Sequence, residues 1–374
     1  MRNYKKKLSL VTWIGDGNFG TCLQSFALHE YLKRNGYDVS IVTMWPKTKG
    51  LKSYIKALAN RVGLLRLQEM WRMRKASLRL KKLNLFVTHG YNFPTLITER
   101  QRKKYLKKTD VFITGSDQIW NTYFGFDPTM FLSFVDNNKR VAYASSIGTN
   151  NIKEEYKDEV RNLLLRFQYI GVRENEAVKV LSDLTGRTDI KQVLDPTFML
   201  TSEDWSDLTK TINIDIRCPQ TYMLCYLIGR NECYKEQIAE VKKAYGIEDI
   251  VIVSSEENPD FNVDNAIVYS SASPLEFVKL IENSSLVCTD SFHATAISIN
   301  CKIDFVEFLR FKDGDKKSQN SRIYDLLNHY MLMNRIYSDS QTGWKSSIDY
   351  TIPQSILISD RKESVDYLIN AIDN

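Results

Sequence analysis

The chain has 374 residues, of which 43% are hydrophobic and 26% charged, the balance of an ordinary globular protein. This length exceeds what one hydrophobic core usually serves, so two domains are expected, and no apolar run approaches the roughly 18 residues of a membrane-spanning helix. The net charge is +6, yet residues 47–108 hold 18 Lys and Arg against two acidic residues, while the remainder is net acidic. One surface is therefore expected to meet an anionic partner.

The first predicted element is a buried strand at residues 8–14. A basic segment precedes it, as in a signal peptide, but the apolar run is too short and no small-residue cleavage site follows. The six cysteines form no C-x-x-C pair and lie mostly in apolar runs, which is typical of reduced thiols in a cytosolic protein. Four histidines without an H-x-x-x-H pair predict no metal site.

A β-α-β unit opens the chain, which implies a parallel sheet. Apolar residues at helical spacing predict a helix over 21–35, and Gly36 follows it as a C-cap would, before a strand at 38–44. The remaining elements of the first half are a long basic helical stretch at 51–86, strands at 110–114, 140–145, 169–172 and 192–194, and helices at 153–166 and 175–184.

A second α/β series begins after Asp195-Pro196 and an acidic stretch at 202–207. Its predicted strands are 222–228, 250–254, 285–289 and 303–308, and its predicted helices are 233–245, 274–283, 292–299, 322–332 and about 360–372. We therefore predict an α/β fold of two Rossmann-like domains facing across a cleft. The first domain spans 1–200 and includes the basic segment 47–108, the second spans 201–350, and a C-terminal helix within 351–374 is expected to pack back on the first.

Polar residues recur where the predicted strands end, which is where ligands bind in doubly wound sheets. The candidates in chain order are Asp16, Asn18, Ser116, Asp117, Ser145, Arg173, Glu174, Asp290, Ser291 and His293. The first of these turns, residues 15–20, is glycine-rich and leads directly into a helix, an arrangement that suits an anion or a sugar. It lacks the acidic residue of a dinucleotide site and the Gly-Lys-Ser/Thr of a Walker loop, and a plain tight turn is the alternative.

The segment Asp290-Ser291-Phe292-His293 is the sharpest local signal, because a strand delivers it and a helix follows. His293 would lie in the first helical turn, where it could transfer a proton beside backbone amides that hold an anion. The alternative is a histidine packed against the sheet. Arg173 ends a strand and could grip a carboxylate or phosphate, or else form a surface ion pair with Glu174 or Glu176.

In their order, these motifs resemble the polysaccharide pyruvyl transferase family. The matching blocks are Gly-Asp-Gly-Asn-Phe-Gly at 15–20, the adjoining 21–28, Gly-Ser-Asp-Gln-Ile-Trp-Asn at 115–121, 142–148, Val172-Arg173-Glu174, 194–197 and Thr289-Asp290-Ser291-Phe292-His293. The resemblance spans about 8–335. It implies a glycosyltransferase B-type fold and transfer of a pyruvyl group from phosphoenolpyruvate to sugar hydroxyls as a ketal, with no cofactor or metal.

The resemblance also implies roles for particular residues. His293 carries over as the proton donor, assisted by Asp290, and Arg173 carries over to the donor side with Ser291. The family's arginine beside the histidine does not carry over, because Ser291 stands there; Arg310 and Arg322 are candidates to replace it. The residues expected to hold the acceptor sugar are Asp16, Asn18, Ser116 and Asp117.

The resemblance places the protein in exopolysaccharide or capsule synthesis of the cell envelope. We expect a cytoplasmic protein with a lipid-linked glycan acceptor, and segment 47–108 could lie on the anionic inner membrane surface, or else pack as a solvated arm on the first domain. No motif supports nucleic-acid binding. The alternative functions are a glycosyltransferase that uses a nucleotide sugar and a non-catalytic subunit that binds sugar or lipid diphosphate.

Overall fold

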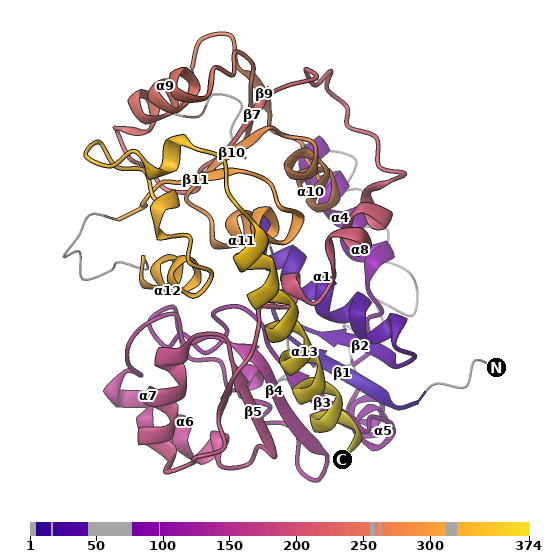
Figure 1. Cartoon of the computed structure of the whole chain (residues 1–374). Helices are drawn as coiled ribbons and strands as arrows, with labels where there is room; N and C mark the ends of the chain where they lie inside the picture. The colour runs from indigo at the N-terminus through magenta and orange to yellow at the C-terminus, as the bar shows by residue number, and fades with distance from the viewer. Residues whose placement is uncertain are drawn as a thin grey trace. The chain divides into compact units, whose positions relative to one another are not determined.

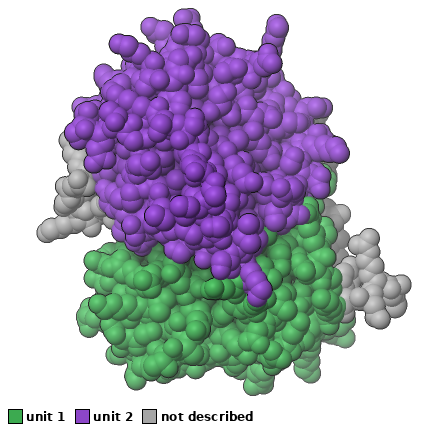
Figure 2. Space-filling view, in the orientation of Figure 1, with its two compact units in different colours: residues 1–16, 24–199, 363–374 green, residues 17–23, 200–362 purple. Residues whose placement is uncertain are grey.

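The computed structural model describes residues 5–15, 18–43, 77–96, 98–254, 259, 261, 263–311 and 320–374. The chain divides into two compact units (Figure 2), which are described separately below. Unit 1 comprises residues 1–16, 24–199 and 363–374, and unit 2 comprises residues 17–23 and 200–362. The elements follow one another in α/β order along the chain (Figure 1).

Unit 1 is built on a six-stranded sheet in the order β2-β1-β3-β4-β5-β6. Every pairing in the sheet is parallel. The strands are β1 (Lys7–Val11), β2 (Asp38–Val42), β3 (Val111–Thr114), β4 (Lys139–Ser145), β5 (Tyr169–Val172) and β6 (Lys191–Gln192). The helices are α1 (Phe19–Arg34), α4 (Leu78–Gly90), α5 (Glu99–Lys108), α6 (Lys157–Leu164) and α7 (Asn175–Thr185), with short 3₁₀ turns at Pro128–Phe131, Glu154–Tyr156 and Pro196–Phe198.

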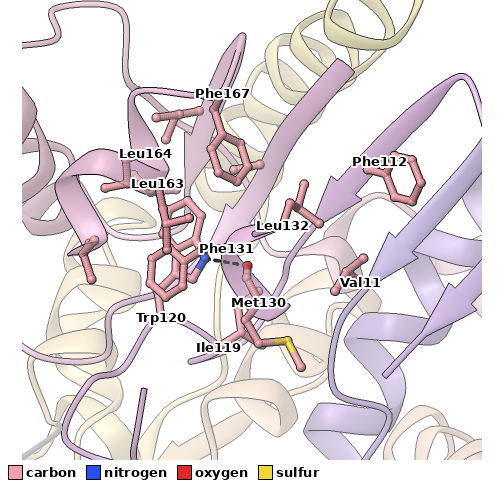
Figure 3. Close-up of a cluster of buried hydrophobic side chains, with 14 of the residues drawn as sticks. Val11, Phe112, Ile119, Trp120, Met130, Phe131, Leu132, Leu163, Leu164 and Phe167 are labelled. Atoms are coloured by element: carbon pink, nitrogen blue, oxygen red, sulfur yellow. Dashed lines mark hydrogen bonds between the residues drawn. The ribbon is translucent and has the colours of Figure 1, made fainter. Parts of the chain in front are cut away.

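The core of unit 1 contains aromatic side chains on the segment that follows β3 (Figure 3). Trp120 is buried, stacks on Phe131 with ring centroids 5.2 Å apart, and meets Phe167 edge-on. Its indole N–H donates to the carbonyl of Met130 at 3.0 Å, so the polar end of the ring is satisfied inside the core. This packing holds the loop after β3 against the sheet.

Unit 2 is built on a five-stranded parallel sheet in the order β11-β10-β7-β8-β9. The strands are β7 (Met223–Tyr226), β8 (Ile250–Val253), β9 (Ile267–Tyr269), β10 (Leu286–Thr289) and β11 (Phe305–Glu307). The helices are α8 (Ser202–Thr209), α9 (Tyr234–Tyr245), α10 (Pro274–Glu282), α11 (Phe292–Cys301) and α12 (Ser321–His329), with 3₁₀ turns at Met333–Arg335 and Gly343–Lys345. Numbered from its own first strand, this is the Rossmann order 3-2-1-4-5.

The last helix, α13 (Thr351–Asp373), begins about nine residues before the predicted start. Pro353 lies in its first turn, where the missing backbone N–H is not needed, so proline does not interrupt the helix. The part from Glu363 onward belongs to unit 1. There Tyr367 donates a hydrogen bond to the carbonyl of Ala142 in β4 and covers Gly171 in β5, where a β-carbon would come within 2.8 Å of the tyrosine ring.

The predicted α/β class and parallel sheets are confirmed, but several elements differ from the sequence prediction. Helices α5 and α8 and the three-residue strand β9 were not predicted. The predicted helix 51–86 lies outside the described residues as far as residue 76, and its described end belongs to α4. In the part of the chain that the structure describes, no helix is both long enough and apolar enough to span a membrane.

Candidate functional site

In unit 2 the strand order reverses between β7 and β10, so the loops after these two strands diverge at one edge of the sheet. Ligands of open α/β sheets bind outside the carboxyl ends of strands at such a reversal. The loop after β7 contains Ile228 and Gly229, and the loop after β10 begins with Asp290. The segment 290–293, which carried the sharpest signal in the sequence, therefore lies at the position where the topology predicts a binding site.

Asp290 joins the two loops of this reversal. Its buried carboxylate accepts hydrogen bonds from the backbone N–H groups of Ile228 and Gly229, both at 2.7 Å, and from the Tyr234 hydroxyl at 2.8 Å. Arg310 completes the set, with its Nε 3.2 Å from the carboxylate and its Nη2 2.9 Å from the Asp290 carbonyl. Burial, together with the negative charge of Asp290, raises the pKa of Tyr234, so this hydroxyl remains a hydrogen-bond donor at neutral pH.

A small pocket lies beside Asp290. Its lining residues are Asp290, Phe292, Phe308, Arg310, Phe311, Asn320, Arg322 and Ile323. Arg310 is held by Asp290 but keeps 25% of its side chain exposed, and Arg322 lies in the first turn of α12. Two guanidinium groups beside aromatic rings suit a small ligand that carries carboxylate or phosphate groups.

Asn320 stabilises the wall of this pocket. Its side-chain amide donates to the carbonyl of Phe311 at 2.8 Å, and its carbonyl oxygen accepts from the Phe311 backbone N–H at 3.4 Å. Asn320 directly precedes α12, so this pair of bonds connects the start of that helix to the segment that carries Arg310. The predicted donor-side arginines 310 and 322 therefore line one pocket.

Ser291 and His293 occupy the start of α11. Ser291 is the N-cap residue, and its carbonyl accepts hydrogen bonds from the backbone N–H and hydroxyl of Thr295. His293 is 8% exposed and lies edge-on to the ring of Phe292, which lines the pocket. The imidazole thus belongs to the same strand end as Asp290.

The start of α1 also belongs to unit 2. Phe19 stacks on Phe277 with ring centroids 4.7 Å apart and contacts Tyr226, the last residue of β7. The side chain of Asn18 caps the helix by accepting from the N–H groups of Gly20 at 2.9 Å and Thr21 at 3.4 Å. Although sequence reasoning assigned Asn18 to the first half, its neighbours group it with the second.

Glu307, the last residue of β11, is a further candidate that was not predicted from the sequence. Its side chain is fully buried, and the hydroxyl of Thr295 donates to its Oε2 atom. Burial raises the pKa of Glu307 well above its usual value, and nearby Asp290 acts in the same direction. In the sequence, only the place of Glu307 at a strand end distinguishes it.

In unit 1 the strand order reverses between β1 and β3, and Gln24 connects the loops that follow them. Its side-chain amide donates to the carbonyl of Trp13 at 3.2 Å and contacts the hydroxyl of Thr12 at 3.4 Å. Its carbonyl oxygen accepts from the backbone N–H of Ser116 at 3.0 Å. Gln24 was noted only as part of a motif, because a glutamine inside a helical pattern carries no signal of such a contact.

Arg173 lies in a buried charge cluster at the end of β5. Its guanidinium contacts Glu174 at 2.9 Å and Asp195 at 3.0 Å, and the hydroxyls of Ser146 and Ser116 donate to these two carboxylates. Burial opposes the charge on Arg173, but the two carboxylates outweigh it and raise its pKa. Arg173 therefore forms an ion pair with Glu174, as the alternative interpretation expected, although the pair is buried rather than at the surface.

Two predicted acceptor residues remain. Asp117 is nearly buried and adopts a left-handed backbone conformation, with φ at 69°, while its side chain accepts from the N–H of Gln118. Asp16 lies outside the described residues. Unit 1 thus contains Ser116, Asp117 and Arg173, and unit 2 contains Asn18, Asp290, Ser291, His293, Arg310 and Arg322. Of the six in unit 2, Asp290, Arg310 and Arg322 line the pocket, whereas Asn18, Ser291 and His293 are not among its lining residues. Among described residues, no group of three His, Cys, Asp or Glu side chains could hold a metal ion.

Comparisons with known proteins agree with this architecture. A sequence model described as polysaccharide pyruvyl transferase matches residues 18–309, most of the chain, which confirms the resemblance seen in the motifs. No curated protein matches the sequence. One similar solved structure is UDP-GlcNAc 2-epimerase from Neisseria meningitidis bound to UDP-GlcNAc, with a TM-score of 0.50, 11% identity, and coverage of 98% of this chain and 94% of that one.

A second similar structure is MurG from Acinetobacter baumannii, with a TM-score of 0.45, 9% identity, and coverage of 98% of this chain and 99% of that one. At such low identity, structural likeness informs only the fold. The similarity to the epimerase confirms the predicted glycosyltransferase B-type class of two Rossmann-like units.

Proposed function

Because the chain belongs to the polysaccharide pyruvyl transferase family, we propose that it transfers the pyruvyl group of phosphoenolpyruvate to two hydroxyls of a glycan, forming a cyclic ketal. The observation that carries this proposal is the pocket of unit 2, where Arg310 and Arg322 lie beside Asp290 at the reversal of strand order. The family makes the protein a transferase, and the pocket supports a small anionic donor.

Phosphoenolpyruvate carries a carboxylate and a phosphate on adjacent positions of a three-carbon skeleton. Two guanidinium groups can each grip one such group in bidentate fashion, which offsets part of the negative charge of the donor. Asp290 fixes Arg310 by two contacts, so this side chain is oriented before the donor arrives. The donor supplies the reacting atoms itself, and the proposal therefore includes no cofactor.

Arg310 and Arg322 also explain how Ser291 can stand where the family motif has an arginine. Ser291 is a buried helix cap whose neighbourhood includes the pocket residues Asp290 and Phe292. We propose that its backbone and hydroxyl line the donor side, while the two arginines provide the positive charge. Arg173, which is buried between two carboxylates, would then stabilise the end of its own strand.

In the proposed chemistry His293 donates a proton to the methylene carbon of phosphoenolpyruvate, which becomes a methyl group. The adjacent carbon develops oxocarbenium character and forms a bond to a first sugar oxygen, whose proton returns to the imidazole. The bond to phosphate then breaks, a second hydroxyl adds to the same carbon, and its proton leaves with the released phosphate. Asp290 assists by holding the strand ends and Arg310 in place.

The acceptor is proposed to be a lipid-linked glycan that meets the protein at the cytoplasmic membrane surface. Asn18 is exposed and is proposed to contact its hydroxyls, together with Asp16, while the buried Ser116 and Asp117 shape the loop after β3. Six of the ten residues of α5 are Lys or Arg, and leucines 78, 80 and 85 of α4 are exposed. We propose that the basic side chains of α5 contact anionic lipid head groups and that the exposed leucines of α4 contact the apolar part of the membrane.

The reaction can be tested with phosphoenolpyruvate labelled with ¹³C at its methylene carbon, incubated with the protein and a panel of sugars and lipid-linked oligosaccharides. The proposal predicts loss of the vinyl signal, a new ketal methyl signal and release of one phosphate per ketal. His293→Ala is expected to abolish the methyl signal. Transfer of a sugar from an added nucleotide sugar, without consumption of phosphoenolpyruvate, would overturn the proposal.

A further inference from the structure

Gly20 lies in the first turn of α1, directly against the imidazole of His293. A β-carbon on Gly20 would come within 2.1 Å of the ring nitrogen Nδ1, 2.6 Å of Cγ and 2.9 Å of Cε1. All three are ring atoms, and Cγ is the atom that attaches the ring to its side chain. No rotation of the ring about its own bond could therefore make room for a methyl group.

The backbone conformation of Gly20 does not explain the glycine. The residue is helical, and its φ does not lie in the left-handed region that favours glycine. Glycine is among the least favourable residues within a helix, and alanine is the most favourable. The reason for glycine at this position is therefore the space that the imidazole occupies.

Neither partner can easily move away. Phe19 stacks on Phe277 and contacts Tyr226, which anchors the turn to unit 2, and the Gly20 N–H is bonded to Asn18. His293 is 8% exposed and lies beside Phe292, so little space surrounds the ring. The imidazole thus has one well-defined position, and Gly20 packs directly against one side of the ring.

We propose that Gly20 is a positioning residue that sets the location of the His293 imidazole at the strand end of Asp290. The catalytic consequence of this inference rests on the proposed function, because a displaced imidazole would no longer reach the methylene carbon of phosphoenolpyruvate. It does not depend on that function for its test, since the position and titration of an imidazole can be measured without substrate.

The test uses protein with ¹³C-labelled histidine and follows the ring signals as a function of pH. The chain has four histidines, so His293→Ala identifies the signal of residue 293. Gly20→Ala is expected to move that ring signal while leaving the ring signals of His89 and His329 in place. The matched control is Gly90→Ala, since Gly90 is also helical but the nearest atom to a β-carbon there lies at an ordinary 3.6 Å. An unchanged His293 signal in Gly20→Ala would overturn the proposal.

Thermal unfolding provides a second arm in case Gly20→Ala folds poorly. In the wild-type background, the substitution should lower the melting temperature because of the clash. In the His293→Ala background, the same substitution should lower it less, because the ring atoms that the methyl group would meet are absent and alanine favours the helix. An equal decrease in melting temperature in both backgrounds would contradict the proposal that Gly20 makes room for the imidazole of His293. Failure of the wild type to bind phosphoenolpyruvate would overturn the proposed function and leave these two results standing.

Discussion

The hydroxyl of Tyr234 donates a hydrogen bond to the Oδ2 atom of Asp290 at 2.8 Å, and both groups are buried. The same carboxylate oxygen accepts from the Gly229 N–H and faces Nε of Arg310. Asp290 thus holds together the loop after β7, the start of α9 and the arginine of the pocket. Asp290 therefore organises the pocket.

Asp290→Ala should lower the free energy of unfolding by about 3–5 kcal/mol, because it leaves buried donors and part of Arg310 without their acceptor. Tyr234→Phe removes one hydrogen bond and should cost only about 1 kcal/mol. Urea denaturation of both variants measures the difference. Equal, small losses would show that the carboxylate does not organise these loops.

Arg173→Met should also be strongly destabilising, by about 3–5 kcal/mol, since it leaves Glu174 and Asp195 as buried carboxylates without a cation. Ser116→Ala, which removes one hydrogen bond to Asp195, should cost about 1 kcal/mol. Denaturant unfolding gives both values. If Arg173→Met folds with wild-type stability and only weakens phosphoenolpyruvate binding, Arg173 contacts the donor directly.

His29 should make the stability of the protein depend on pH. Burial, together with Lys33, lowers the pKa of His29 to about 4, whereas an unfolded histidine titrates near 6.5. The unfolded state therefore binds more protons between these values, and the stabilisation that is present above pH 6.5 is lost as the pH falls towards 4. The expected loss between pH 7.5 and pH 5 is about 2 kcal/mol.

Comparison with His29→Leu isolates this contribution, because other groups also titrate; Asp360, for example, raises the pKa of His329 by a hydrogen bond. Urea unfolding at the two pH values should show a smaller decrease in the variant than in the wild type. The same decrease in the free energy of unfolding in both proteins would mean that folding does not lower the pKa of His29.

Asn18 caps α1 through its side-chain oxygen, so Asn18→Ala should cost about 1 kcal/mol of stability. Asn18→Asp keeps the acceptor oxygen and should retain wild-type stability. Thermal or urea unfolding separates the two. A loss of stability in Asn18→Asp that equals the loss in Asn18→Ala would exclude capping as the role of this side chain.

The order of elements could be predicted well from the sequence, because buried parallel strands appear as short apolar runs followed by polar turns. The same reasoning found Asp290, His293 and Arg310 as residues at or near strand ends. It could not find Gln24 or Glu307, whose importance comes from hydrogen bonds to residues distant in sequence. Nor could it predict that Gly20 would adjoin His293, because 272 positions of chain separate them and only the folded unit brings them together.

Arg173 illustrates the same limit in another way. Its place before a helix suggested a ligand-binding guanidinium, but the two carboxylates that surround it include Asp195, 22 positions later. A sequence pattern does not reveal whether a charge at a strand end faces a ligand or a buried partner. That distinction required the fold.

The most direct test of the account is calorimetric titration of the full-length protein with phosphoenolpyruvate and, separately, with UDP-GlcNAc. The account predicts saturable binding of phosphoenolpyruvate that weakens at least tenfold, about 1.4 kcal/mol, in Arg310→Ala and in Arg322→Ala. Arg217→Ala removes an exposed arginine of unit 2 that does not line the pocket, and should leave the affinity unchanged. Binding of UDP-GlcNAc in place of phosphoenolpyruvate, or phosphoenolpyruvate binding that is insensitive to Arg310 and Arg322, would contradict the account.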